Sequence, residues 1–451
     1  MREGWYIWET SNLIAKDTLE IGDGYRAKNS EMGIDGLPFA RAGNINNGFH
    51  FDSADVLASH SVQKAGNKIS IPGDVVFTSK GTIGRFAFVK PSTPQFVYSP
   101  QLCYWRVKDA TIVDPLYLYY WMQGPYFFSL VHKVKSLTTM ADYVSLSDQR
   151  KMHIIAPSIH EQKKIAGILS AYDDLIENNT RRIAILEEMA RMLYQEWFVN
   201  FRFPGHENVN MVESPLGMIP EGWDVVKLGD VCSITMGQSP SSQFYNVEGD
   251  GLPFHQGVTD FGKLFPSDRV YCTYDGRVAH PGDILFSVRA PVGRINIANK
   301  KIVIGRGISA ICSKSGHQRF MFQLLKDKFQ EEDIIGNGSI FKAVTKEEIN
   351  GVELIYPNEE MIIAFEDSVI SLLLDVENLL KRNANLRYTR DLLLPRLISG
   401  EIDVSSWVED SPVEEVVDKG EELAMAAVGA QVEPMRPIDT KSLTWHSLWD
   451  Q

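Results

Sequence analysis

Cysteines are few in this chain, and long apolar runs are missing. The four cysteines form no C-x-x-C pair, which argues against a disulfide framework or a cysteine zinc site and fits a reducing compartment. No window approaches about 18 uninterrupted apolar residues, so we expect no membrane span. The first residues hold no apolar signal-peptide core either. We therefore expect a cytoplasmic protein.

Motifs that carry enzyme chemistry are also missing. The chain has no P-P-Y or P-P-F motif, with which a methyltransferase would clamp an extruded base, and no H-x3-H or H-x2-E-H zinc cluster. Residues 257–264 have the G-x4-G-K spacing of a P-loop, but Leu264 stands where a serine or threonine would hold magnesium. We expect a chain without catalytic residues, metal ion or cofactor of its own.

The net charge of −13 leaves a nucleic-acid ligand open. Residues 404–451 hold ten acidic and three basic residues, so this segment alone accounts for −7. The rest of the negative charge is spread over the remaining sequence, which leaves room for local basic surfaces. We expect residues 404–451 to form a flexible acidic tail.

What the sequence does contain is an internal duplication. Three motifs recur in the same order: D-G-L-P-F, then a P-G-D turn that leads into an apolar strand and a Gly-Arg pair, then a strand closed by proline. The first copies are residues 35–39, 72–85 and 153–157, and the second copies are residues 250–254, 281–294 and 353–357. A long helical segment follows each set, so we predict two homologous globular domains. Short apolar runs between Gly, Pro, Asn and Asp turns predict that both are β-rich, with helices near residues 115–132 and 317–329.

The two long helical segments carry a coiled-coil pattern. Core positions alternate by four and three residues from 165 to 197 and from 365 to 397, with one asparagine in each set, Asn179 and Asn383. An antiparallel pairing places the two asparagines opposite each other, whereas a parallel pairing leaves the Asn179 amide facing Leu379. We predict an antiparallel coiled coil whose Asn–Asn layer fixes the register. The alternative is two helices that each pack on their own domain.

A coiled coil of this length would act as a stiff spacer. At about 1.5 Å per residue each helix would be about 50–60 Å long, with one globular domain at each end. Two similar modules held apart in this way suit a DNA duplex with two half-sites about 34 Å apart.

Several segments resemble the specificity subunits of Type I restriction–modification systems. Residues 217–231, with G-M-I-P-E-G-W and L-G-D-V, resemble the opening of a target-recognition domain. Residues 193–205 resemble the central region of the family, and residues 392–403 resemble its C-terminal region. The first domain opens at residues 8–13 without a clear I-P-x-G-W start, and the acidic tail has no counterpart in the first repeat.

The resemblance implies an α+β fold and a function without chemistry. Two homologous β-rich target-recognition domains, residues 1–158 and 204–357, would be joined by two long helices, residues 159–203 and 358–403. The chain would read a bipartite target in double-stranded DNA and direct two methyltransferase subunits, to which a motor–nuclease subunit can be added. S-adenosylmethionine, ATP and Mg²⁺ would belong to those partners. The alternatives are the recognition subunit of a Type IIB-like methyltransferase and a coiled-coil scaffold that binds protein instead of DNA.

Basic and amide side chains in the repeated loops are the candidate DNA contacts. Cations are suited to phosphates, and arginine, asparagine, glutamine and threonine are suited to base edges. The cations that follow the two P-G-D strands are Lys80 and Arg85 in the first domain and Arg289 and Arg294 in the second. The residues that follow the two D-G-L-P-F strands are Arg41, Asn44, Asn46 and Asn47 in the first domain and Gln256 and Thr259 in the second. The alternatives are turn arginines that pair with carboxylates and loops that are merely solvated. We expect the aromatic residues of segment 197–203 to pack in a core.

Overall fold

A computed structural model describes residues 4–46, 48–81, 83–134, 144–274, 276–329, 334–335, 339–340, 343–404, 407 and 413–428. The chain divides into two compact units. Of the described residues, the first unit comprises those up to Asn179 and those from Arg382 onward, and the second comprises those in Thr180–Lys381. Each unit therefore contains one β-rich domain and one half of each long helix.

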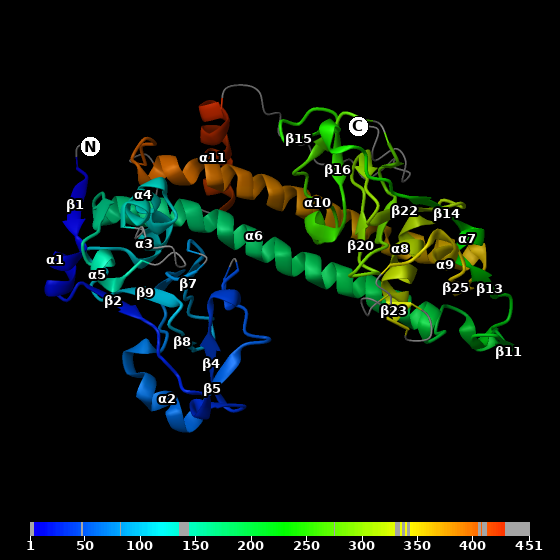
Figure 1. Cartoon of the computed structure of the whole chain (residues 1–451), viewed down its shortest axis with the longest axis horizontal. Coiled ribbons are helices and arrows are strands. Elements are labelled where there is room, and N and C mark those ends of the chain that lie inside the picture. The colour runs from blue at the N-terminus through cyan, green and yellow to red at the C-terminus, as the bar shows by residue number, and fades with distance from the viewer. Residues whose placement is uncertain are drawn as a thin grey trace. The chain divides into compact units, whose positions relative to one another are not determined.

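The first unit is built on two four-stranded sheets, with strand orders β2-β9-β6-β7 and β3-β5-β4-β8, and on the two-stranded sheet β1-β10. Its strands are β1 (Tyr6–Glu9), β2 (Leu19–Asp23), β3 (Met32–Gly33), β4 (Gly36–Ala40), β5 (Asp55–Ala58), β6 (Val75–Thr78), β7 (Phe86–Phe88), β8 (Val97–Tyr98), β9 (Leu102–Val107) and β10 (His153–Ala156). Its shorter helices are α1 (Thr10–Ala15), α2 (Ser59–Ala65), α3 (Pro115–Met122), α4 (Pro125–Val134), α5 (Leu146–Gln149) and α11 (Val413–Val428). The long helices α6 (Ile159–Tyr194) and α10 (Glu359–Ile398) are shared between the units (Figure 1).

The second unit has a four-stranded sheet β14-β22-β19-β20, a five-stranded sheet β15-β17-β16-β21-β18 and three two-stranded sheets. Its strands are β11 (Met211–Ser214), β12 (Gly217–Pro220), β13 (Asp224–Lys227), β14 (Cys232–Met236), β15 (Tyr245–Asn246), β16 (Leu252–His255), β17 (Tyr271–Cys272), β18 (Val278–Ala279), β19 (Ile284–Ser287), β20 (Ile295–Ile297), β21 (Ile302–Ile304), β22 (Ile308–Ser313), β23 (Ile334–Ile335), β24 (Ser339–Ile340) and β25 (Glu353–Tyr356). Its shorter helices are α7 (Leu228–Val231), α8 (Gln318–Lys328) and α9 (Lys346–Asn350).

The two domains repeat one topology, which confirms the predicted duplication. In each, the strand after the P-G-D turn is central in an antiparallel sheet: β6 pairs with β9, and β19 pairs with β22. The D-G-L-P-F strand lies parallel to a short strand in both, β4 with β8 and β16 with β21. The proline-closed strand pairs with the opening strand, β10 with β1 and β25 with β13.

The two domains also begin with the same local structure, a correspondence that the sequence analysis missed. Gly4 and Gly222 both have a positive φ, a conformation that glycine adopts without a steric penalty. Each is followed by a buried tryptophan, Trp5 or Trp223. The E-G-W triplets at residues 3–5 and 221–223 are the signal that could have revealed this correspondence.

One expected helix is divided in the structure. Residues 115–132 were expected to form a single helix, but α3 ends at Met122 and α4 begins at Pro125. Proline has no amide hydrogen for a helix interior and is tolerated in the first turn, so Pro125 starts a new helix. The counterpart near residues 317–329 is the single helix α8.

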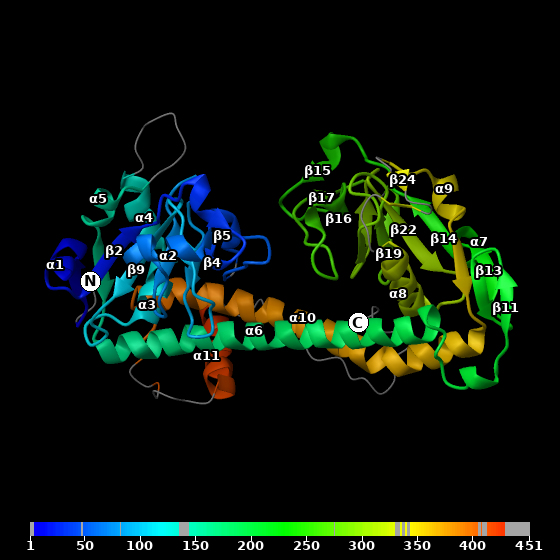
Figure 2. The same ribbon diagram turned by 90° about the horizontal axis from the view of Figure 1, so that it is seen from below.

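Within each unit, the two long helices lie side by side and run antiparallel (Figures 1 and 2). In the first unit, Ile165 of α6 and Leu397 of α10 are buried in one hydrophobic core. In the same unit, the Asn179 Nδ2 donates a hydrogen bond of 2.9 Å to the Asn383 Oδ1, and both side chains are buried. The Asn383 Nδ2 in turn donates to the Ile176 carbonyl at 3.4 Å. The predicted antiparallel arrangement of the helices is confirmed.

The second unit uses its halves of the helices in the same manner. Ile183 of α6 and Leu379 of α10 are buried in its core. Trp197, Phe198 and Phe203, in the segment that follows α6, are buried there as well. The aromatic residues therefore pack, as expected. No helix within the described residues is long and apolar enough to cross a membrane.

Part of the segment that we expected to be a flexible tail is helical. Residues 413–428 form α11, and Val416, Val417 and Ala424 of this helix are buried in the core of the first unit. The apolar side chains of α11 recur at helical spacing, so one face of the helix can be buried despite its acidic composition.

Breaking the asparagine pair should destabilise the first unit. We expect Asn383→Leu to lower the free energy of unfolding by about 1–3 kcal/mol, because it leaves the Asn179 amide buried without its partner. The double variant Asn179→Leu/Asn383→Leu should recover most of that loss, since no polar group is then left unsatisfied. Urea unfolding of the three chains tests this, and a double variant no more stable than the single one would contradict it.

Candidate nucleic-acid interface

Loops from distant parts of the sequence meet at one edge of the domain in the first unit. The Ser99 amide donates to the Ala40 carbonyl at 2.9 Å, which joins the loop after β4 to the turn after β8. Gln101 in that turn accepts from the Ser79 amide through its backbone carbonyl and from the Ala42 amide through its side chain, both at 3.1 Å. The fold thus brings together the loops that contain the predicted contacts.

The same backbone frame is present in the second unit. The Gly305 amide donates to the His255 carbonyl at 2.8 Å, and the Gly307 amide donates to the Gln256 carbonyl at 3.1 Å. The Val288 amide donates to the Gly307 carbonyl at 3.0 Å. The turn after β21 therefore joins the loop that contains Gln256 to the loop that contains Arg289.

These loops form an open pocket of about 220 Å³ in the second unit. The side chains of Gln256, Arg289 and Arg306 line it, and all three residues are exposed. The remaining lining residues are Gly257, Val258, Ala290 and Gly307. Arg306 was missed by the sequence analysis, although its position between two glycines at the end of an apolar strand was a usable signal. Two guanidinium groups and one amide are a donor set suited to phosphates and base edges.

The polar groups of this pocket are held in place by their neighbours. The Ser239 hydroxyl donates to the Gln256 Oε1 at 3.0 Å and accepts from the Arg306 amide at 3.2 Å. A Cβ at Gly307 would lie 2.6 Å from the Gln256 carbonyl oxygen, so this close approach of two backbones requires glycine. Among the described residues the Gln256 Nε2 donates no hydrogen bond, which leaves it available to a ligand.

A buried histidine lies beneath the Gln256 loop. His255 is fully buried, and its Nε2 lies 3.3 Å from the Asp268 carboxylate, which also pairs with Lys300 at 2.7 Å. Burial alone raises the pKa of Asp268, but the hydrogen bonds from His255 and Lys300 outweigh it and hold that pKa below its usual value. The carboxylate therefore stays charged at neutral pH and anchors the strand end that presents Gln256.

In the first unit, two of the predicted contacts are already engaged by other groups of their domain. Arg41 forms an ion pair with Asp55, with its Nε 2.8 Å from the carboxylate. The Asn44 side chain accepts from the Arg41 amide at 2.8 Å and donates to the His50 carbonyl at 3.0 Å. Asn44 therefore shapes the loop, and the charge of Arg41 is partly compensated. The sequence could not show this, because Asp55 lies beyond the loop on β5.

The predicted cations near the P-G-D strands differ in their surroundings. The Arg85 Nη1 donates to the carbonyls of Ala42 and Ile45 at 3.2 and 3.5 Å, so this side chain braces the Arg41 loop. Arg85 pairs with carbonyls there, in place of the carboxylate that the alternative interpretation expected. Four other predicted residues are exposed: Lys80 and Asn46 in the first unit, and Arg294 and Thr259 in the second. Asn47 lies outside the described residues.

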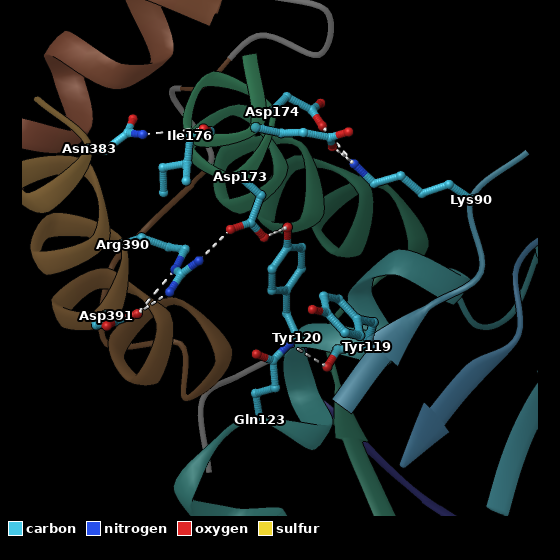
Figure 3. Close-up of polar contacts among 11 residues, drawn as sticks. Lys90, Tyr119, Tyr120, Gln123, Asp173, Asp174, Ile176, Asn383, Arg390 and Asp391 are labelled. Carbon is cyan, nitrogen blue, oxygen red and sulfur yellow. Dashed lines mark hydrogen bonds and ion pairs between the residues drawn. The ribbon is translucent and has the colours of Figure 1, made fainter. Parts of the chain in front are cut away.

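Ion pairs and hydrogen bonds fix the β-rich domain of the first unit to the long helices (Figure 3). The Lys90 ammonium lies 2.6 Å from the Glu177 carboxylate of α6. The Tyr120 hydroxyl of α3 donates to Asp173 of α6 at 2.7 Å, and Arg390 of α10 pairs with the same carboxylate. Burial raises the pKa of Tyr120, so its hydroxyl remains a donor. These contacts join the β-rich domain of the first unit to both long helices.

The described residues contain no cluster of three or more His, Cys, Asp or Glu that could hold a metal ion. The structure has two similar β-rich domains on paired helices, and each domain has loops with basic and amide side chains. These features define the class of nucleic-acid recognition proteins.

Comparisons with known proteins identify the family. Residues 8–188 and 220–378 match the family described as Type I restriction modification DNA specificity domain. A protein named as the MjaX specificity subunit of a type I restriction enzyme, from Methanocaldococcus jannaschii, is 29% identical over 412 residues, which cover 88% of this chain and 94% of that protein. The type I restriction enzyme HindI specificity subunit of Haemophilus influenzae is 23% identical over 400 residues, with coverage of 73% and 86%.

A solved structure shares the fold. The S subunit of a Type I restriction–modification system from M. genitalium superimposes with a TM-score of 0.53 at 15% identity, over 87% of this chain and 96% of that one. The chain belongs to the Type I restriction–modification DNA specificity family. It is the DNA specificity subunit, which does not itself catalyse a reaction and directs the partner subunits of its system.

The ion pair between Arg41 and Asp55 should weaken the affinity of the first unit for DNA. We expect Asp55→Asn to release the Arg41 charge and to steepen the dependence of log K on log[salt] by up to about one unit. Fluorescence anisotropy with duplex DNA at several salt concentrations measures that slope. Asp52→Asn is the control, because it removes the same charge from an exposed residue that forms no ion pair among the described residues. If the two substitutions change the slope equally, the effect comes from the change in net charge and not from the release of Arg41.

Proposed function

We propose that each unit reads one half of a bipartite target in double-stranded DNA. The proposal is supported by one backbone frame that occurs twice and carries different side chains. In the second unit the frame presents Gln256, Arg289 and Arg306. In the first unit the corresponding edge presents Lys80 and Asn46. Two similar frames with different donors suit two half-sites of different sequence.

The pocket of the second unit is the single observation that carries this proposal. Arginine forms bidentate hydrogen bonds with the O6 and N7 of guanine, and glutamine does so with the N6 and N7 of adenine. Ser239 orients the Gln256 amide for such a use, because its hydroxyl donates to the Oε1. An amide oxygen accepts two hydrogen bonds, so the second lone pair and the Nε2 can both face a base edge. We therefore propose Arg289, Arg306 and Gln256 as base-reading residues.

Other exposed cations and polar residues would position the domains on the DNA. We propose that Lys80, Arg85 and Arg294 contact phosphates, which hold a protein in register without carrying sequence information. For Arg41, Asn44 and Thr259 we propose a supporting role at the same surfaces. Arg41 already pairs with Asp55, and Asn44 already bonds to the backbone of its own loop.

We further propose that the paired helices serve as the ruler and the assembly platform. Helix α6 has 36 residues and α10 has 40, and both continue from one unit into the other. Their length would set the number of unspecified base pairs between the half-sites. Two methyltransferase subunits would dock on them, with a motor–nuclease subunit added in a cleaving complex. S-adenosylmethionine, ATP and Mg²⁺ would be bound by those partners.

The methylation pattern of cells that carry the system tests the reading function. We expect a single split motif, two short blocks around a fixed spacer, that disappears when this gene is deleted. Arg289→Ala and Arg306→Ala should each relax or abolish recognition of the block read by the second unit, because a bidentate arginine–guanine contact contributes about 1–3 kcal/mol of discrimination.

The block read by the first unit should be unchanged in these variants. Arg202→Ala is the matched control, because it removes an exposed arginine of the same unit that pairs with Glu196 far from the pocket in sequence. Equal loss of both blocks in the Arg289 or Arg306 variants would contradict the assignment of one half-site to each unit.

A further inference from the structure

Helix α11 is seated on the paired helices within the first unit. Val416 and Val417 are buried there, and the Val417 carbonyl accepts a hydrogen bond of 3.0 Å from the Tyr172 hydroxyl of α6. In Figure 1, α11 lies across α10. The contact is built from small aliphatic side chains on one side of α11, while Glu415 and Glu422 are exposed on that helix.

A glycine makes this close seating possible. A Cβ at Gly420 would lie 2.0 Å from the Tyr172 hydroxyl oxygen and 3.2 Å from the Leu393 Cδ1. The backbone of α11 therefore approaches both long helices more closely than any other residue would allow at this position. Trp407, which is buried, and Lys419, whose ammonium lies 4.6 Å from the centre of the Trp407 ring, extend the contact.

The internal duplication supplies the equivalent surface in the second unit, where none of the described residues covers it as α11 does in the first unit. The alignment that matches residue 165 with 365 also matches Leu386, Thr389 and Leu393 of α10 with Leu186, Met189 and Leu193 of α6. The three α10 positions are buried in the first unit, with relative exposures of 1%, 7% and 1%. In the second unit Met189 is 49% exposed, and Leu186 and Leu193 are half-buried.

The uncovered surface has the character of a helix-binding face. Ile185 and Met192 flank Met189 at helical spacing and are 60% and 55% exposed, so an apolar stripe runs along this part of α6. Contiguous exposed apolar residues of this kind mark interaction sites, and methionine adapts well to a partner surface. Helix α11 shows what the equivalent face accepts: an amphipathic helix with small apolar contact residues.

We propose that α11 occupies one of two equivalent helix-binding faces, and that the uncovered face of the second unit binds an amphipathic helix of the partner methyltransferase subunit. This inference rests on the proposed recruitment of two methyltransferase subunits. The first subunit binds at the Met189 face without hindrance. The second must displace α11 from the Tyr172 and Leu393 face, so α11 competes with it from within the chain.

The loss of affinity for the second methyltransferase subunit depends on the fraction of molecules in which α11 is bound at its own face. Residues 399–412 connect α10 to α11, and a connection this short gives the helix a high effective concentration at its own face. If α11 is seated in about 99% of molecules, the apparent Kd for the second methyltransferase subunit rises about 100-fold over that for the first.

Titration of the full chain with the methyltransferase subunit of the same system tests the proposal. Calorimetry and light scattering should show one tight and one weaker binding event for the full chain. A chain that ends at residue 409, and so lacks α11, should bind two subunits with similar affinity. Gly420→Phe should act like the shortened chain, because the new side chain cannot fit against Tyr172. Glu422→Ala, exposed on the same helix, is the matched control.

Two further readouts separate the possible failures. Met189→Glu should abolish the tight event in the full chain, whereas Ala184→Glu, an exposed position elsewhere on α6, should leave it intact. Hydrogen exchange of residues 413–424 should become faster only when the second subunit binds. Identical stoichiometry and affinities for the full chain, the shortened chain and Gly420→Phe would overturn the role of α11. Absence of methyltransferase binding to every chain would instead overturn the proposed recruitment itself.

Discussion

The antiparallel pairing of α6 and α10 is the constraint on which the rest of the structure depends. Because the helices run in opposite directions, the start of α6 meets the end of α10, and the core of the first unit combines Ile165 with Leu397. Neither unit can complete its core from one continuous stretch of chain. The Asn179–Asn383 hydrogen bond opposes any slippage of the helices, since a shift of one layer would bury both amides among apolar side chains.

The loops that contain the proposed DNA contacts depend on this support through a short chain of contacts. Asp173 of α6 accepts from Tyr120 and pairs with Arg390, so one carboxylate joins both long helices to the domain. Inside the domain, backbone hydrogen bonds join the loops to each other, with side chains such as Gln101 and Ser239 completing the frame. Recognition of base edges requires donors held to within a fraction of an ångström, and loops tied in this way meet that requirement better than free ones.

The sequence predicted features that extend over many residues. It did not predict single contacts between residues that come together only when a loop folds. The duplication, the β-rich domains and the antiparallel helices follow from repeated motifs and from heptads sustained over many residues. The partners of Arg41 and Asn44 do not follow, because Asp55 and the His50 carbonyl come close only after the loop has folded. Arg306 was missed because no second copy of it exists: its turn matches the turn in the first domain that contains Gln101. The helix α11 was missed because its acidic residues mask a short apolar face.

The two domains carry different side chains on one backbone frame. Each retains the backbone hydrogen bonds between the loop after the D-G-L-P-F strand and the turn that follows the parallel strand, as between Gly305 and His255. Backbone atoms are the same for every residue type, so this frame tolerates substitution of its side chains except at close approaches such as that of Gly307. The second unit adds a buried histidine and an open arginine pocket, whereas the first uses a compensated ion pair and an amide cap. Because the helices carry each frame separately, a change in one set of donors need not disturb the other.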